Sequence, residues 1–271
     1  MPLTVRDSIN SNQLYAVFSD LCNAYVIKDF LSTTETKIAI NTFSYLSDFV
    51  KVPTPRGFIA PCSFAQFSQA GMDLFSSTTN VFNAYDLRGL EWLEKKLLDF
   101  FNDLKGDLNL EPLPIQTPSE IIHCPLFSFR EIRADEAGMH IHSHNQLHEL
   151  NPAFAEHAAV TIDLTNDVSY FILLQAPEQG GDLVLYDAPW QPGQRNSSND
   201  FIVQPDGSLL DVNNPAFVQK QTITLEPGDM VVFESGKTWH QVTAVKGELP
   251  RITLGGFFSK SKSGETVYYY T

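Results

Sequence analysis

The second part of the chain is a succession of short β-rich segments, and this pattern limits the fold more than any other feature. From about Cys124, branched and aromatic runs alternate with Gly, Pro, Asn and Asp, as strands joined by turns do. The candidate strands are Leu126–Arg133, Gly138–His144, Ala159–Leu164, Ser169–Gln175, Asp182–Tyr186, Gln219–Leu225, Asp229–Glu234, His240–Val245, Arg251–Phe258 and Thr266–Tyr270. Strands in series without intervening helices predict a sandwich or jelly roll.

The first 120 residues have a different pattern, which predicts a mostly helical layer. In Asp86–Leu104 leucines recur at spacings of three and four, and Gly106 follows as a stop signal. Leu14–Phe30 is a weaker helical candidate. We therefore predict a single domain over residues 1–271, mainly β with α, in which N-terminal helices (about 1–120) pack on a β core (about 124–271). The polar segment 188–217 is expected to form a long excursion that helps to shape a substrate pocket.

Composition narrows the classes of partner. The chain of 271 residues is 43% hydrophobic, enough for a sizeable core, and its net charge of −14 would repel a nucleic acid. No run approaches the ~18 apolar residues of a membrane-spanning helix. Three scattered cysteines fit neither a disulfide framework nor a zinc cluster. These features predict a cytoplasmic protein with neither a nucleic-acid nor a membrane partner.

The histidines are distributed unevenly, and this distribution suggests a metal site. Five of the seven lie between residues 140 and 157, where His140, His142 and His144 alternate along the chain. On an extended strand, residues two apart point to the same side, so these imidazoles would share one face. Neutral imidazole is the commonest metal ligand among side chains. A distant histidine, His240, could complete the site.

A second pattern surrounds His240. The Pro227–Gly228 turn begins one predicted strand, a turn before His240 begins the next, and Gly247 with Pro250 marks a turn before the strand that starts at Arg251. This order predicts His240 and Arg251 on adjacent antiparallel strands. An arginine in that position can hold a carboxylate through two hydrogen bonds while the histidine holds a metal.

Taken in order, these segments resemble the Fe(II)/2-oxoglutarate-dependent oxygenases of the double-stranded β-helix fold, a jelly-roll, cupin-like architecture. The resemblance covers roughly residues 125–260. It rests on Gly138–Asn145, on Ser169–Gln175 followed by Gly180-Gly181-Asp182-Leu183, on Pro227–Phe233, and on the segment from His240 through Gly247 to Arg251.

The resemblance implies a set of cofactors and roles. His142 and His240 would bind Fe(II), and Arg251 would pair with the distal carboxylate of 2-oxoglutarate, with Thr253 and Tyr170 as hydrogen-bonding helpers. Iron would activate O2 while 2-oxoglutarate is decarboxylated. The expected reaction is hydroxylation of a small molecule such as a free amino acid or a natural-product intermediate.

The sequence departs from the family at one ligand. The family binds iron through two histidines and one carboxylate, read as His-any-Asp/Glu on the first strand. Here His144 stands where the carboxylate should be; if His140 were the first ligand, His142 would take that place. We prefer the set His142, His144 and His240. The nearby carboxylates Glu149 and Asp135 lack the two-residue spacing.

This departure leaves several functions open. His144 could complete a three-histidine site, or swing away and leave an open position, as in related halogenases, where a small residue makes room for chloride. The protein could instead be a cupin-type three-histidine dioxygenase that needs no 2-oxoglutarate. A non-enzymatic metal-binding β domain is the remaining alternative.

Overall fold

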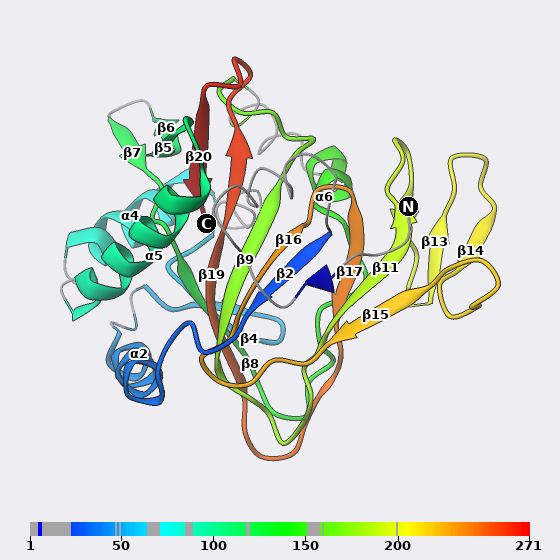
Figure 1. Ribbon diagram of the computed structural model, residues 1–271, viewed down its shortest axis with the longest axis horizontal. Helices are drawn as coiled ribbons and strands as arrows, with labels where there is room; N and C mark the ends of the chain where they lie inside the picture. Colours follow the sequence, from blue (N-terminus) through cyan, green and yellow to red (C-terminus); the bar gives the residue numbers. More distant parts are fainter. Residues whose placement is uncertain are drawn as a thin grey trace.

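The computed structural model describes residues 5–6, 23–46, 48, 50–63, 71–84, 89–117, 120–150, 158, 160–198 and 200–271. Its main element is a ten-stranded sheet, mostly antiparallel (Figure 1). Along the sheet the strands are β1 (Val5–Arg6), β2 (Ala24–Ile27), β16 (Met230–Glu234), β9 (Val168–Gln175), β19 (Arg251–Lys260), β8 (Ser128–Ile132), β4 (Gly57–Ala60) and β3 (Val52–Thr54). β20 (Thr266–Tyr270) also pairs with β19, and β5 (Asn109–Pro112) pairs with β20.

A smaller sheet lies against one face of the large one. It consists of β15 (Lys220–Ile223), β11 (Leu183–Pro189) and β17 (Thr238–Val242). Leu183, Leu185 and Ile223 of this sheet pack against Leu173 and Val231 of the large sheet in one buried cluster. The two facing sheets form the predicted jelly-roll core, and residues of both sheets line a cavity.

Alternation along the central strands separates two faces. On β9, Tyr170, Ile172 and Leu174 belong to the large helix-side core, whereas Phe171 and Leu173 face the smaller sheet. Successive side chains of a strand point to opposite faces, so one run of apolar residues serves both layers. The same alternation on β19 decides which residues reach the cavity.

Three helices cover the outer face of the large sheet (Figure 1). They are α2 (Thr33–Tyr45), α4 (Met72–Ala84) and α5 (Glu91–Leu104). In α5, Leu93, Leu97 and Phe101 are fully buried, as the leucine spacing predicts. Helix α2 begins with a capping box, in which Ser32 and Glu35 each accept a backbone N–H of the other. The predicted helical layer is therefore present between residues 33 and 104.

The N-terminal part also contains strands that the sequence pattern did not predict. β2 occupies residues within the predicted helix Leu14–Phe30; residues 14–22 lie outside the described part of the chain. β3, β4 and β5 extend the large sheet. Val26 pairs with Val231 of β16, so β2 is held by a strand far along the sequence. Residues 1–120 thus supply both helices and the outer strands of the β core.

Several short elements complete the described chain. The excursion 188–217 forms a separate sheet of β12 (Arg195–Asn196), β13 (Phe201–Val203) and β14 (Leu209–Asp211), which projects from the body in Figure 1. The other pairs are β6 (Pro114–Gln116) with β7 (Ile121–His123), and β10 (Gln179–Gly180) with β18 (Val245–Lys246). In the described part of the predicted strand Ala159–Leu164, residues 160–164, β pairing is limited to an isolated bridge at Ile162.

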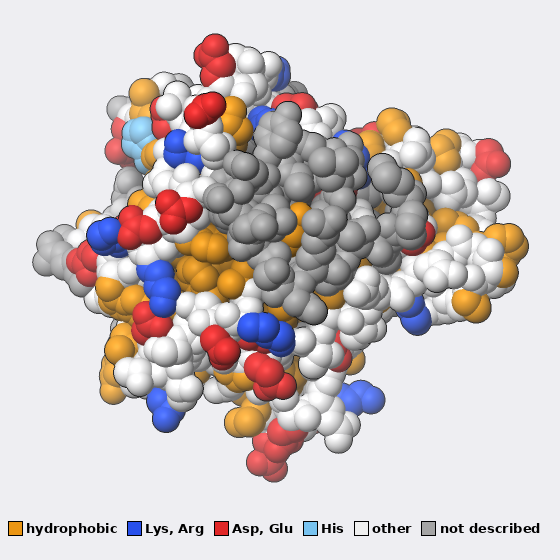
Figure 2. Space-filling model, in the orientation of Figure 1, with side chains coloured by type: hydrophobic (Ala, Val, Ile, Leu, Met, Phe, Trp, Pro, Cys, Tyr) orange, Lys and Arg blue, Asp and Glu red, His pale blue; other side chains and the backbone are white. Residues whose placement is uncertain are grey.

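Charged side chains of both signs share the surface, and the described helices are short. Figure 2 shows acidic and basic side chains interspersed over the face in view. Within the described ranges, no helix is long and apolar enough to cross a membrane.

Candidate metal centre

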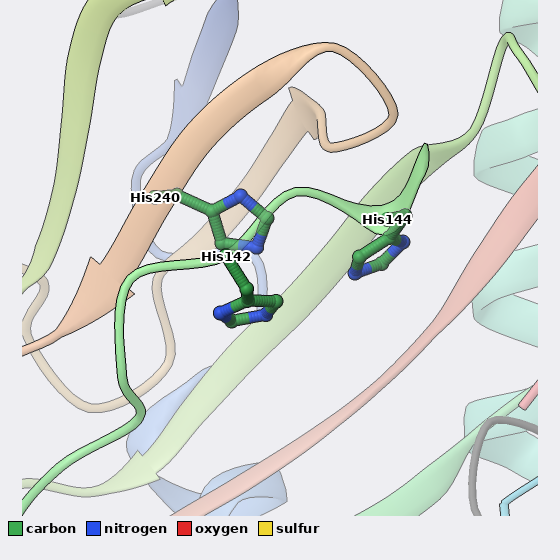
Figure 3. A group of neighbouring side chains, drawn as sticks. All are labelled: His142, His144 and His240. Atoms are coloured by element: carbon green, nitrogen blue, oxygen red, sulfur yellow. The ribbon is translucent and has the colours of Figure 1, made fainter. Parts of the chain in front are cut away.

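Three imidazoles from two distant parts of the chain meet at the cavity between the sheets (Figure 3). One nitrogen of each of His142, His144 and His240 lies within 4.8 Å of the others. The ring centroids of His142 and His240 are 4.2 Å apart, and those of His144 and His240 are 5.5 Å apart. This spacing would let one metal ion contact all three nitrogens.

The backbone positions these residues more directly than the predicted strand Gly138–His144 would. His142 forms an isolated antiparallel bridge with His240, and each amide donates to the other residue's carbonyl at 2.9 Å. The His144 amide donates to the carbonyl of Ser235 at 2.9 Å, and helix α6 (His144–Leu150) begins there. The strand prediction is therefore wrong, although His142 and His144 face the same cavity. His140 is exposed and lies outside the cluster.

Each imidazole is also held through its Nδ1 atom. In His142, Nδ1 lies 2.6 Å from the carbonyl oxygen of His140, and in His240 it lies 2.8 Å from that of Thr238. A carbonyl only accepts, so both Nδ1 atoms carry the proton and the Nε2 lone pairs remain for a metal. Nδ1 of His144 lies 3.1 Å from the hydroxyl of Ser235.

Burial keeps the three imidazoles uncharged. Burial, followed by the nearby His144, lowers the pKa of His142 to about 3. Burial also lowers the pKa of His144, against an opposite effect of Asp167, and holds the pKa of His240 well below its usual value. All three are therefore neutral at pH 7, the form that binds metal ions. A neutral all-imidazole set suits Fe(II) as well as other first-row divalent metals.

Arg251 lies on the opposite wall of the same cavity, on β19, whereas His240 lies on β17 of the smaller sheet. The prediction that the two occupy adjacent strands is therefore wrong, because the sheets face each other across the cavity. Arg251 is 4% exposed, its Nε donates to the carbonyl of Gly181 at 2.8 Å, and its guanidinium lies 5.0 Å from the ring centre of Phe171. Burial, followed by the like charge of Arg130, lowers its pKa to about 10, which leaves it charged.

The other two predicted cosubstrate residues, Thr253 on β19 and Tyr170 on β9, point to different faces of the large sheet. Thr253 lies two residues after Arg251 on β19, and both side chains line the cavity. Tyr170 lies on β9 in the helix-side core, where its hydroxyl donates to the carbonyl of Leu126 at 2.7 Å and its ring packs on Phe101. Tyr170 also borders the cavity, but its hydroxyl already has a partner away from the histidines, so we leave it out of the proposed cosubstrate site.

Arg130 is a cavity residue that the sequence reasoning missed. It pairs with Thr253 across β8 and β19, which places both side chains on the cavity face. The strand Leu126–Arg133 was predicted, but its pairing partner could not be read from the sequence. The cavity measures about 230 Å³, and none of the described residues that line it is acidic. Two guanidinium groups on its wall favour an anionic occupant.

Asp167 was missed as well, and it lies directly behind His144. Its carboxylate is fully buried, with Oδ2 2.6 Å from Nε2 of His148 and 3.7 Å from Nδ1 of His144. Burial opposes ionisation, but the nearby His148 prevails and holds the pKa of the Asp167 carboxyl below its usual range. The sequence Thr165-Asn166-Asp167 looks like a turn, so only the folded structure connects this residue with the metal centre.

Comparison with solved structures identifies the fold. The chain is similar to an N-substituted L-amino acid dioxygenase from Burkholderia ambifaria AMMD, with 15% identity, coverage of 95% of this chain and 90% of that chain, and a TM-score of 0.57. The α-ketoglutarate complex of that enzyme gives 14% identity, the same coverage and a TM-score of 0.56. HygX from Streptomyces hygroscopicus with nickel and 2-oxoglutarate bound gives 13% identity, coverage of 92% and 87%, and a TM-score of 0.49. No curated protein sequence matches the chain.

The class is thus that of Fe(II)/2-oxoglutarate-dependent enzymes with a double-stranded β-helix, as the resemblance implied. Within this class, residues 95–271 match the model of the carrier-protein-independent halogenase WelO5, and the chain belongs to that family. The predicted fold, enzyme class, iron and 2-oxoglutarate are confirmed. Membership decides against the two alternatives without 2-oxoglutarate, the cupin-type dioxygenase and the non-enzymatic domain. It favours halogenation over the hydroxylation that we expected first.

Proposed function

We propose that this enzyme binds Fe(II) through His142, His144 and His240, and that it transfers a hydroxyl group to a small molecule. The observation that carries the proposal is the third imidazole. A halogenase of this class needs an open position at the metal for a halide, and the ring of His144 lies within the ligand cluster. The amide and Nδ1 of His144 both have partners on Ser235, which supports a fixed ring.

The cavity residues divide the remaining tasks. Arg251, charged and held by the Gly181 carbonyl, would bind the distal carboxylate of 2-oxoglutarate, and Thr253 would donate a hydrogen bond to it. Bound iron and 2-oxoglutarate would supply the O2-dependent oxidation. Phe171, Phe233 and Phe257 line the cavity with apolar surface, which would exclude water and favour a compact substrate. Free and N-substituted amino acids are the first compounds to test.

Halogenation is the second candidate, and the family to which the chain belongs favours it. It requires that His144 leave the metal so that a halide can bind. The contacts of His144 with Ser235 oppose this movement. The two reactions therefore differ in one observable, the occupancy of the third ligand position.

The deciding experiment compares products formed with and without halide. Purified enzyme, Fe(II), 2-oxoglutarate and a substrate panel are incubated in chloride, in bromide and in halide-free buffer, and products are identified by mass spectrometry. We expect a gain of one oxygen atom in all three buffers, coupled to succinate release. A chlorinated or brominated main product would overturn the hydroxylation proposal in favour of the second candidate. Failure to bind 2-oxoglutarate would contradict both.

A further inference from the structure

The structure assigns a positioning role to Asp167: it holds His144 in the orientation and protonation form that presents Nε2 to the metal. This inference rests on the proposed ligand role of His144. Among the described residues no carboxylate joins the histidine cluster, but the fully buried carboxylate of Asp167 lies behind the imidazole of His144, 3.7 Å from its Nδ1.

The groups that face Nδ1 of His144 favour the proton on that atom. The Ser235 hydroxyl oxygen lies 3.1 Å from Nδ1 of His144 and can accept its N–H. The negative carboxylate 3.7 Å from the same Nδ1 favours the proton on that atom. The lone pair is then on Nε2, which faces His142 and His240.

Asp167 is itself held firmly enough for this task. Its carboxylate accepts hydrogen bonds from His148 and Ser259, and the Ser259 hydroxyl also contacts that of Tyr270 at 3.3 Å. Its backbone carbonyl accepts from the amides of Ser235 and Gly236 at 3.0 and 2.9 Å. One residue therefore fixes the backbone that holds His144 and also places a negative charge beside its ring.

This arrangement gives the third ligand a carboxylate–histidine–metal relay, in which the outer carboxylate orients the imidazole and raises its basicity. In the usual site the negative charge is on a carboxylate bound to the metal. Here the negative charge is on Asp167, and the neutral ring of His144 lies between it and the metal position. Removing this charge should weaken metal binding by roughly 10- to 100-fold.

The test is a double-mutant cycle on metal affinity. Dissociation constants for Co(II) are measured by competition with a chelator for the full-length wild type, Asp167→Asn, His144→Ala and the double variant. Co(II) absorption bands report the ligand set. Asp167→Asn keeps the size of the side chain but offers an N–H to Nδ1, which favours the opposite protonation form of His144. Asp163→Asn, in the same loop, serves as the matched control, because the described hydrogen bonds of the Asp163 carboxylate are to its loop neighbours Thr165 and Asn166.

We expect Asp167→Asn to weaken Co(II) binding and change its absorption in the wild-type background, and to have little effect once His144 is alanine. An equal loss in both backgrounds would overturn the positioning role. If His144→Ala alone leaves Co(II) binding intact, the ligand proposal fails instead, so the two failures are distinguishable. Should Asp167→Asn not fold, Ser235→Ala removes the acceptor of Nδ1–H while keeping the carboxylate, and the same cycle with His144→Ala applies.

Discussion

The backbones of His142 and His240 hold each other through two reciprocal hydrogen bonds, each with an N–O distance of 2.9 Å. The bridge joins the segment before α6 to β17, so the polypeptide itself aligns these two imidazoles. Preorganised ligands lose little conformational entropy when a metal binds. The metal centre is therefore expected to depend on backbone contacts near the bridge as well as on the histidines.

Gly138 is one such contact. A Cβ at this position would overlap the carbonyl oxygens of Val242 and Thr243, at the end of β17. We expect Gly138→Ala to destabilise the protein by about 1–3 kcal/mol, as overpacking does, and to weaken metal binding by displacing the bridge. Urea unfolding and Co(II) titration measure the two effects. Gly89→Ala is the control, since the nearest atom of the described residues lies 4.0 Å from an added Cβ. Equal behaviour of the two variants would contradict the prediction.

Arg251 should decide the affinity for 2-oxoglutarate. Arg251→Gln removes the buried positive charge that would pair with the distal carboxylate, a loss of about 2 kcal/mol or more, roughly 30-fold in affinity. Calorimetric titration of the Co(II) enzyme with 2-oxoglutarate measures it. Arg133→Gln changes a half-exposed arginine paired with Glu136 and should leave the affinity unchanged. An unaltered dissociation constant in Arg251→Gln would place the cosubstrate elsewhere.

His144 should control which group is transferred. His144→Gly opens the third ligand position, and we expect this variant to bind chloride and yield some chlorinated product, at lower overall activity. His144→Asp is the matched control, because it restores a carboxylate and should keep hydroxylation without halide incorporation. Products are compared by mass spectrometry in chloride and in halide-free buffer. Halogenation by both variants, or by neither, would argue against a gating role for this residue.

The metal-free protein should lose stability in mild acid. The pKa of His142 is about 3 in the folded protein, compared with about 6.5 in an unfolded chain. As pH falls below about 6.5, the unfolded chain takes up protons that the folded protein does not, so the free energy of unfolding decreases towards pH 3. Urea unfolding in the presence of a chelator at pH 7.5, 6 and 5 measures this slope. His142→Gln should flatten it, and identical slopes would contradict the buried neutral state.

The sequence predicted which histidines lie together better than it predicted their surroundings. His142, His144 and His240 could be selected because imidazoles at a two-residue spacing and one distant partner form a pattern that local sequence carries. The placement of Arg251 relative to His240 could not be predicted. Turn signals in the sequence indicate where a strand ends, but not which sheet the next strand joins. β17 pairs with β11, and β19 pairs with β8 and β9.

Three other features could not be predicted for similar reasons. Ala24–Ile27 is a short apolar run, which fits a buried helix or a strand equally well; pairing with β16 decides it. Tyr170 was predicted as a cosubstrate residue because its segment resembles a strand of the family. Side chains alternate along β9, and that of Tyr170 points to the helix side of the sheet. The role of Asp167 depends on a contact with His144 that only tertiary structure creates.

The paired guanidinium groups of Arg130 and Arg251 have a consequence for turnover. A wall that attracts an incoming dianion also retains a departing one, and succinate, the spent cosubstrate, carries the same charge as 2-oxoglutarate. With no acidic residue among the described cavity residues to expel it, we expect release of succinate to limit the catalytic cycle and other short dicarboxylates to compete for the vacated cavity.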